Sequence, residues 1–507
     1  MKEFNKKYYI SSFFWSVFQK AISAIYAFLS VPILLEFYGK SEYGLLGIAT
    51  SCNAYMHLLD LGMNHGASRF YARWRKEGKD DLINRVARTN ITFYNIIAAI
   101  NILFLVVLAF LGENLFSVTY EQFLQLRNCL LILATFSIFS WGTTTFSQLL
   151  VADGQLSFTL IMQCIVSIIK CLLIVAVFLF NFTLTTYFFL LTFIVTSLIF
   201  PYVVKCRKDR LIDSISPAFY WNDFKEVMTF SLSLFALSLF QMTAKDTRPI
   251  ILSLLAPDGA GAVADYSIIA SIPSLIITIG STFTGIFLPK TSSMVVKNDQ
   301  KEISGFAYTW TLRTTIITCL LTFPFIICAK ELIVAYVGIK YVYLTPWLIL
   351  WCFTVLIQIH TTPLGSLVFA YGKMKAIVVT TAIYCVISML INASLCHYLA
   401  VGSAVLGYAI YVCLVIGTYY VYFNKHILHL SRIKMVWIFL RPTFIAIILA
   451  VILMNIPINY FFVSSGNARI DYLFVCIVKS TLWFVPYIVI LQLSKIIDFR
   501  FLVKKNG

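Results

Sequence analysis

The chain has 507 residues, of which 60% are hydrophobic and only 12% are charged, with a mean hydropathy of +0.87. Soluble globular proteins carry about 25% charged residues, so this composition excludes a soluble protein and predicts an all-α polytopic membrane protein. The net charge of +17 suits either nucleic acid or anionic lipid, but no basic domain is large enough to bind nucleic acid. We therefore expect membrane lipids, and no nucleic acid, as partners.

Apolar runs of about 20 residues, the length that crosses a bilayer, recur along the whole chain. The first run follows a basic head without a small-residue cleavage site, so we expect it to remain as an uncleaved span. About 14 transmembrane helices are predicted, joined by connections of about 5 to 20 residues that are too short for a large soluble domain. The predicted spans are 12–35, 43–68, 89–111, 123–149, 156–180, 184–204, 227–255, 263–288, 305–329, 342–370, 376–398, 401–423, 440–462 and 470–493.

Basic residues are divided unevenly between the two sets of connections. If the N-terminus is cytoplasmic, the cytoplasmic connections and tails hold about 28 of the 39 Lys and Arg residues, and the outer connections hold about five. Cytoplasmic loops of membrane proteins carry the excess of Lys and Arg. The sequence therefore predicts that both termini and the segment "KCRKDR" (205–210) are cytoplasmic.

Two pairs of similar segments indicate an internal duplication. "VPILLEFYG" from Val31 is similar to "RPIILSLLA" from Arg248, and "LLVADGQLSFTL" from Leu149 is similar to "LVFAYGKMKAIV" from Leu367, at offsets of 217 and 218. The near-identical offsets predict two parallel six-helix repeats, which both enter the membrane from the cytoplasm. We expect an N-terminal lobe at 1–210, a C-terminal lobe at 211–430, and two extra C-terminal helices with a cytoplasmic tail at 431–507.

Polar residues follow one face of three predicted spans at spacings of three and four residues. Such stripes are costly against lipid and favour a water-filled cavity, although small residues alone also suit helix–helix packing. The stripes are Ser12, Ser16, Gln19, Lys20, Ser23, Ala27 and Ser30; then Asn53, His57, Asp60, Asn64 and Ser68; then Ser231, Ser238, Gln241, Lys245 and Arg248.

The predicted spans contain six basic residues against two clear acidic ones, Asp60 and Asp246. An excess of positive charge in a region of low dielectric attracts anions. Arg313 lies near the cytoplasmic edge and is able to reach the interface. The six candidate residues for binding an anionic cargo are Arg248, Lys245, Lys20, Lys170, Arg313 and Lys479.

Lys245 and Arg248 are three residues apart and share a helix face, whereas Asp246 points about 100° away from Lys245. Pro249 cannot donate a backbone hydrogen bond, so a bend is expected there. Arg248 is expected to contribute most to anion binding because its guanidinium makes two parallel hydrogen bonds. The alternative is a Lys–Asp–Arg cluster that pairs internally and serves packing alone.

His57 and Asp60, one helical turn apart, are candidates with Asp246 for ion coupling; a structural hydrogen-bonded pair is the alternative. His360 is interpreted as a packing residue. The 12 cysteines are scattered, without a CxxC motif or a Cys/His cluster, so no metal, disulfide framework or cofactor is expected. No catalytic constellation or large loop is present, and an enzyme is not expected.

One segment, "FYGKSEYGLLGIATSCNAYMHLLDLGMNHGASRFYAR" from Phe37, resembles the first-to-second-span region of polysaccharide exporters. These exporters are the Wzx-type O-antigen and capsule flippases of the multidrug/oligosaccharidyl-lipid/polysaccharide superfamily. The resemblance is carried by Tyr43–Gly44, by the "LLDLGM" turn into Gly66, and by the arginine-rich loop. The segment "KDTRPIILSLLAPDGAGAVADYSIIAS" resembles the seventh span of that family, with Ala264–Asp265–Tyr266 in place of the usual Gly–x–Tyr.

The resemblance implies alternating access by two six-helix lobes that turn an undecaprenyl-diphosphate-linked oligosaccharide across the bacterial inner membrane. The cargo would be a repeat unit of lipopolysaccharide O-antigen, capsule or exopolysaccharide. The basic residues would hold the diphosphate, and the two extra helices would guide the lipid tail. A coupling ion (H⁺ or Na⁺), a polysaccharide polymerase and chain-length proteins are the implied partners.

Two alternatives stay open at this point. One is a cation-coupled multidrug exporter of the same superfamily, and the other is a flippase for another lipid-linked precursor, such as a peptidoglycan or teichoic-acid intermediate. A cationic drug favours acidic cavity walls, so the balance of six basic to two acidic residues argues against the first alternative.

Overall fold

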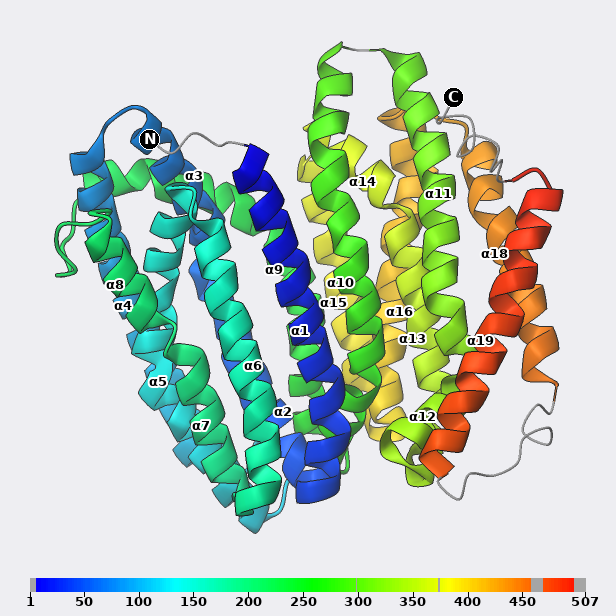
Figure 1. Ribbon diagram of the computed structural model, residues 1–507, viewed down its shortest axis with the longest axis horizontal. Helices are drawn as coiled ribbons and strands as arrows, with labels where there is room; N and C mark the ends of the chain where they lie inside the picture. The colour runs from blue at the N-terminus through cyan, green and yellow to red at the C-terminus, as the bar shows by residue number, and fades with distance from the viewer. Residues whose placement is uncertain (1–5, 298, 373, 457–467, 497–507) are drawn as a thin grey trace. The chain divides into compact units, whose positions relative to one another are not determined.

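The computed structural model describes residues 6–297, 299–372, 374–456 and 468–496, and the secondary structure in these ranges is entirely helical. Twelve helices among the described residues are long and apolar enough to cross a membrane. The protein is therefore an all-α, multi-pass membrane protein. The chain divides into two compact units, Met1–Ser267 with Ala393–Ala400, and Ile268–Asn392 with Val401–Gly507 (Figure 1).

The first unit is a helical bundle in which α4 packs along α5, α1 packs along α6, and α9 packs against α2 and α3. Two serine pairs, Ser12–Ser157 and Ser23–Ser167, join α1 to α6 by hydrogen bonds of 3.1 and 3.2 Å. Its elements are α1 (Lys6–Tyr38), α2 (Lys40–Met56), η1 (His57–Asp60), α3 (Met63–Lys76), α4 (Asp80–Leu111), α5 (Tyr120–Ala152), α6 (Leu156–Phe180), α7 (Leu184–Thr196), α8 (Ile199–Lys208), α9 (Trp221–Leu255) and the start of α10 (Gly259–Lys297).

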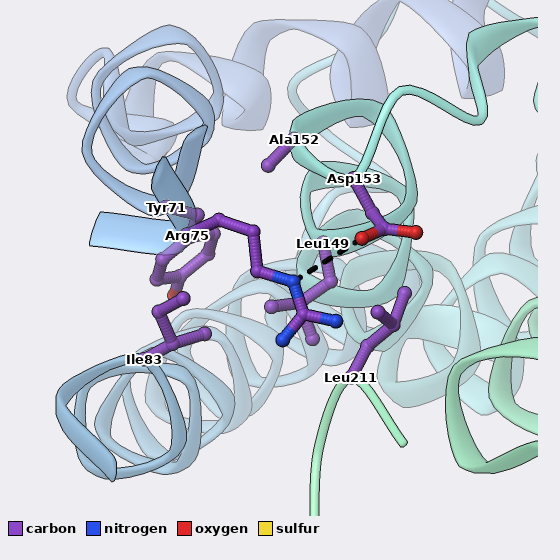
Figure 2. Close-up of a pocket in the computed structure, with 7 residues that line it drawn as sticks. All are labelled: Tyr71, Arg75, Ile83, Leu149, Ala152, Asp153 and Leu211. Carbon is purple, nitrogen blue, oxygen red and sulfur yellow. Dashed lines mark hydrogen bonds and ion pairs between the residues drawn. The ribbon is translucent and has the colours of Figure 1, made fainter. Parts of the chain in front are cut away.

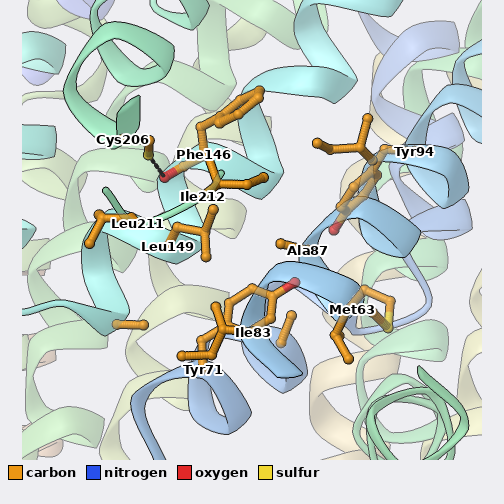
Figure 3. Close-up of a cluster of buried hydrophobic side chains, with 14 of the residues drawn as sticks. Met63, Tyr71, Ile83, Ala87, Tyr94, Phe146, Leu149, Cys206, Leu211 and Ile212 are labelled. Atoms are coloured by element: carbon orange, nitrogen blue, oxygen red, sulfur yellow. Dashed lines mark hydrogen bonds between the residues drawn. The ribbon is translucent and has the colours of Figure 1, made fainter. Parts of the chain in front are cut away.

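A cluster of buried apolar side chains holds one end of this bundle together (Figure 3). Its members come from α3, α4, α5, α8 and α9 and from the segment that leads into α9. The side chains labelled in the figure are Met63, Tyr71, Ile83, Ala87, Tyr94, Phe146, Leu149, Cys206, Leu211 and Ile212. Burial of a large apolar side chain contributes about 1.5–3 kcal/mol to the free energy of unfolding. This cluster therefore holds α3, and the polar groups beside it, in a fixed position.

The second unit is a bundle in which α11 packs on α13 and α18, and α12 packs on α19. Phe323 and Trp483 stack at 5.3 Å between their ring centroids and fix α19 to α11. Its elements are the rest of α10, α11 (Gln300–Ile327), α12 (Ala329–Val337), η2 (Ile339–Leu344), α13 (Thr345–His360), α14 (Thr362–Ala370), most of α15 (Met374–Leu399), α16 (Val401–Thr418), η3 (Tyr419–Phe423), α17 (Asn424–His426), α18 (Arg432–Met454) and α19 (Ala468–Leu493).

Several predicted spans differ from the observed helices. The span predicted at 440–462 is wrong in position, because α18 begins at Arg432 and ends at Met454; the remainder of that prediction, from 457, lies outside the described residues. The Ser431 side chain caps this helix by accepting a hydrogen bond from the Lys434 backbone N–H at 3.4 Å. The segments 184–204 and 342–370 are each divided into two helices.

The first compact unit extends beyond the lobe expected at 1–210. It includes α9 and the first turns of α10, because α9 packs along α2 and α3. The predicted repeat groups segments by similarity of sequence, whereas the units follow physical packing. The predicted lobe boundary and the packing boundary therefore fall at different residues.

Candidate functional site

The span predicted at 43–68 is not one helix but two, α2 and α3, separated by the short 3₁₀ turn η1. Leu61 and Gly62 follow this turn in the left-handed region, with φ of 51° and 74°. A Cβ on Gly62 would meet the Ser231 carbonyl oxygen of α9 at 2.5 Å. The glycine therefore permits both the turn of the chain and the close approach of α9. Broken membrane helices place backbone ends and polar side chains at mid-membrane depth.

Asp60 anchors this break. Its carboxylate accepts a hydrogen bond of 2.6 Å from the Tyr94 hydroxyl and one of 3.2 Å from the Asn64 backbone N–H. The second bond caps the N-terminus of α3, where the helix dipole favours a negative charge. These two hydrogen bonds fix the position of the Asp60 side chain between α4 and the start of α3.

A series of hydrogen bonds between buried polar side chains extends from Asp60. Gln148 donates to the Tyr94 hydroxyl at 3.1 Å, and Asn90 donates to the Gln148 side-chain oxygen at 2.7 Å. All three side chains are buried. None of them was among the residues predicted from the sequence. Asn90 and Tyr94 could have been identified from their spacing, because they lie one helical turn apart on the 89–111 span.

His57 and Asp246, which the sequence analysis grouped with Asp60 as candidates for ion coupling, lie in the same part of the first unit as Asp60. The His57 ring lies 4.8 Å from the Trp141 ring, between centroids, and Trp141 also stacks with Tyr94. The carboxylates of Asp60 and Asp246 both lie within electrostatic range of the imidazole. The structure thus gathers one imidazole and two carboxylates from the broken span and from α9.

Arg248 and Lys245 have different surroundings although they share a face of α9. Arg248 is only 4% exposed; its Nε donates to the Ala244 carbonyl at 2.7 Å, and its Nη1 donates to the Tyr266 hydroxyl at 3.5 Å. Lys245 is exposed, and the half-buried Asp246 carboxylate lies within electrostatic range of both cations. Lys245 is therefore the more accessible of the two cations.

Two other predicted cations lie elsewhere in the first unit. Lys20 is half-buried on α1. The Lys170 ammonium on α6 lies 3.9 Å from the centroid of the Tyr26 ring, and the Tyr26 hydroxyl lies 3.1 Å from that of Tyr187. A cation–π contact of this kind stabilises a lysine inside a membrane span without an acidic partner.

The remaining predicted cations, Arg313 and Lys479, belong to the second unit. Arg313 is exposed and lies over the Trp310 ring at 5.0 Å. Lys479 forms a buried ion pair with Glu331 at 2.5 Å. The sequence count missed Glu331 because the predicted span ended at 329. The excess of positive charge inside the membrane is therefore smaller than the predicted balance of six to two.

Two hollows in the first unit are unsuited to a diphosphate. A cavity of about 10 Å³, room for about one water, lies beside the ion pair of Arg75 and Asp153 at 3.2 Å (Figure 2). A groove of about 280 Å³ between α5 and α7 is lined by Asn128, Leu131, Ile132, Thr135, Phe136, Thr185 and Phe189, none of which is charged.

The cavity lies within a network of ion pairs among the connections. Arg75 also pairs with Asp80 at 2.5 Å, and Arg85 pairs with Asp223 at 2.7 Å. The neighbouring Lys79 ammonium and Arg73 guanidinium lower the pKa of the Glu77 carboxyl. These ion pairs hold together the segments that precede α4 and α9, which the sequence predicts to be cytoplasmic.

The model of the family described as "Polysaccharide biosynthesis protein" matches residues 10–295, which is more than half of the chain. The match includes α2, α3 and α9 and hence the whole cluster around Asp60 and Arg248. No curated protein sequence matches this chain.

Solved structures of transporters have the same fold. A structure of the lipid II flippase MurJ in an inward closed conformation is 13% identical, with a TM-score of 0.67, and covers 97% of this chain and 100% of that chain. An inward-facing multidrug resistance MATE family transporter of the MOP superfamily is 13% identical, with a TM-score of 0.57 and coverage of 87% and 99%.

A MOP superfamily transporter from Pyrococcus furiosus, described as having a binding pocket of reversed polarity, is 14% identical. Its TM-score is 0.53, and the coverage is 89% of this chain and 97% of that chain. Identities this low establish a shared fold and leave the cargo open. The chain shares its fold with these three proteins.

Proposed function

We propose a flippase function for this chain, which belongs to the polysaccharide biosynthesis protein family. Its cargo would be an undecaprenyl-diphosphate-linked oligosaccharide, the repeat unit of an O-antigen, capsule or exopolysaccharide. It would turn this cargo from the cytoplasmic to the outer leaflet of the bacterial inner membrane by alternating access. The family and the transporter fold support transport of a lipid-linked glycan rather than catalysis.

The observation that carries the proposal is the polar cluster on the broken second span and α9. Charged groups at this depth are costly against lipid and are favoured against water or a polar cargo. The exposed Lys245 supplies a point charge for a diphosphate. The buried Arg248, one helical turn along the same face, adds to the positive electrostatic potential at this position. A diphosphate recruits cations of this kind, whereas a cationic drug does not.

Ion coupling is assigned within the same cluster. Asp60 is committed to Tyr94 and to the end of α3, so it is the anchor of the break. Among the described residues, no comparable pair of side-chain hydrogen bonds holds His57 or Asp246, and the two side chains lie within electrostatic range of each other. We assign any exchange of H⁺ or Na⁺ during transport to His57 and Asp246.

A flippase for another lipid-linked precursor is the second candidate function, because the structure is similar to that of a lipid II flippase. Deletion of the gene in its own host distinguishes the two. The proposed function predicts loss of surface polysaccharide and accumulation of its lipid-linked repeat unit, both reversed by the wild-type gene. Accumulation of lipid II with normal surface polysaccharide would favour the second candidate, and a changed sensitivity to cationic drugs alone would favour an exporter.

Single cysteines introduced at opposite ends of the first unit test the topology. In a background without the 12 native cysteines, Asn181→Cys is expected to react with a membrane-impermeant maleimide added from outside, and Arg207→Cys is not. Both positions are exposed, so accessibility to the reagent depends on the side of the membrane. Permeabilised cells provide the control, since both positions should then react. Labelling of Arg207→Cys alone in intact cells would reverse the orientation.

A further inference from the structure

The first turns of α2 and α10 lie in direct backbone contact within the first unit. A Cβ on Gly44 would overlap the Ala260 carbonyl oxygen, and one on Gly47 would meet the Val263 Cγ1 at 2.6 Å. Small residues allow membrane helices to approach this closely. Both helices begin at the end that the charge distribution places outside the cytoplasm, so this seam closes the outer end of the unit.

An ion pair crosses the same seam. The Lys40 ammonium lies 3.0 Å from the Asp265 carboxylate, and the Asp265 side chain is only 7% exposed. An ion pair that is partly shielded from water is worth more than a fully exposed one, because removal of one partner leaves the other charge buried. Separation of α2 from α10 would therefore move a carboxylate out of a favourable site.

The outer connection between α4 and α5 holds the neighbouring end of α9. The Ser117 N–H donates to the Ser253 carbonyl at 2.8 Å, and the Ser117 hydroxyl donates to the Leu254 carbonyl at 3.0 Å. The Gly259 N–H donates back to the Ser117 carbonyl at 2.9 Å. Carbonyls in the last turn of a helix have no partner within the helix, so Ser117 caps α9 from another part of the chain.

We propose that Lys40, Ser117, Gly259 and Asp265 form an outer clamp that controls release of the cargo. The clamp joins elements of the first predicted repeat (α2 and the α4–α5 connection) to elements of the second (α9 and α10). Because the two repeats must separate at their outer ends to release a cargo there, the clamp holds the closed state and opens in each transport cycle. This inference rests on the proposed flippase function for its role.

A cysteine placed inside the seam reports whether the clamp is open. Ser267 is half-buried, and its Oγ would lie 3.4 Å from a Cβ on Gly47. In a background without native cysteines, Ser267→Cys is expected to react slowly with an impermeant maleimide from outside. Asp265→Asn and Lys40→Met should each increase that rate about fivefold to thirtyfold, the effect of 1–2 kcal/mol on a two-state equilibrium. The charge swap Lys40→Asp with Asp265→Lys should return the rate toward the original value.

Glu77→Gln is the matched control, because it removes a carboxylate from exposed ion pairs far from the seam. It should leave labelling of Ser267→Cys unchanged, and Asn181→Cys should react quickly in every variant. Unchanged labelling of Ser267→Cys in both Asp265→Asn and Lys40→Met would overturn the clamp. The assay needs no cargo: faster labelling in a protein that moves no glycan would keep the clamp and reject the flippase function, and the reverse result would reject the clamp alone.

Discussion

Replacement of Arg248 by alanine is expected to abolish or sharply reduce surface polysaccharide, and replacement by lysine to restore only part of it. The guanidinium is buried and donates to the Ala244 carbonyl and the Tyr266 hydroxyl. Hydrogen bonds to charged groups contribute about 1.5–3 kcal/mol each to stability, and the alanine variant loses both of these bonds. Lysine keeps the charge but not the fork of donors. The measurement is surface glycan per molecule of membrane-inserted protein, together with the amount of inserted protein.

Lys245→Ala is the matched control for Arg248→Ala, since it removes an exposed cation from the same face of α9. We expect Lys245→Ala to leave the amount of protein unchanged and to lower export per molecule roughly tenfold, as expected for loss of about 1.4 kcal/mol of cargo binding. Arg248→Ala should lower both quantities. Normal export per molecule in both alanine variants would remove these two residues from the cargo site and leave the cluster as packing.

The effect of replacing Asp60 on protein stability depends on whether the new side chain keeps an oxygen that accepts hydrogen bonds. Asp60→Ala removes the cap of α3 and leaves the buried Tyr94 hydroxyl without its acceptor, a combined loss of about 2–4 kcal/mol in the free energy of unfolding. Asp60→Asn keeps an acceptor oxygen, so we expect nearly normal protein levels and most of the export. Thermal unfolding of the purified variants and surface glycan measured between pH 6 and 8 provide the test.

The Asn variant separates anchoring from coupling. If Asp60 itself exchanges a proton with each cargo, the Asn variant will be folded but inactive across this pH range, and the assignment of coupling to His57 and Asp246 will be wrong. Tyr94→Phe is the companion variant, because it removes the donor of the same hydrogen bond and keeps the ring that stacks on Trp141. It should lower stability less than Asp60→Ala, since the cap of α3 remains.

Span length and apolar content made most of the fold predictable. Each of the twelve helices that are long and apolar enough to cross a membrane overlaps one of the predicted spans, with 440–462 displaced from its helix. The span was predicted as one helix through Met56, because its polar stripe continues at helical spacing, although the resemblance had marked "LLDLGM" as a turn. The signals that mark it are local, namely an aspartate three residues before the start of α3 and a glycine at Gly62. α18 was misplaced because its charged first turns lowered the local hydropathy.

The sequence offered candidate residues for the site but did not reveal their partners in the fold. Spacing placed Lys245 and Arg248 on one face, and only the packing of Tyr266 shows that one is covered and the other exposed. The sequence count treats Lys479 as an unpaired cation, whereas in the structure it pairs with Glu331, 148 positions away in the chain. Pairings across such distances depend on how helices pack, which a single sequence does not encode in its local pattern.

The central claim, transfer of a lipid-linked oligosaccharide between leaflets, is tested most directly with purified protein in liposomes. Undecaprenyl-diphosphate oligosaccharide is incorporated with the protein, and an impermeant glycan-cleaving enzyme is added outside. Without transfer, about half of the glycan is accessible, because the cargo divides evenly between two leaflets. We expect cleavage to approach completion with wild-type protein and to stay near one half with Arg248→Ala inserted at equal amount. Cleavage that stops at one half with the wild-type protein, for the host's own repeat unit and with an ion gradient imposed, would contradict the flippase function.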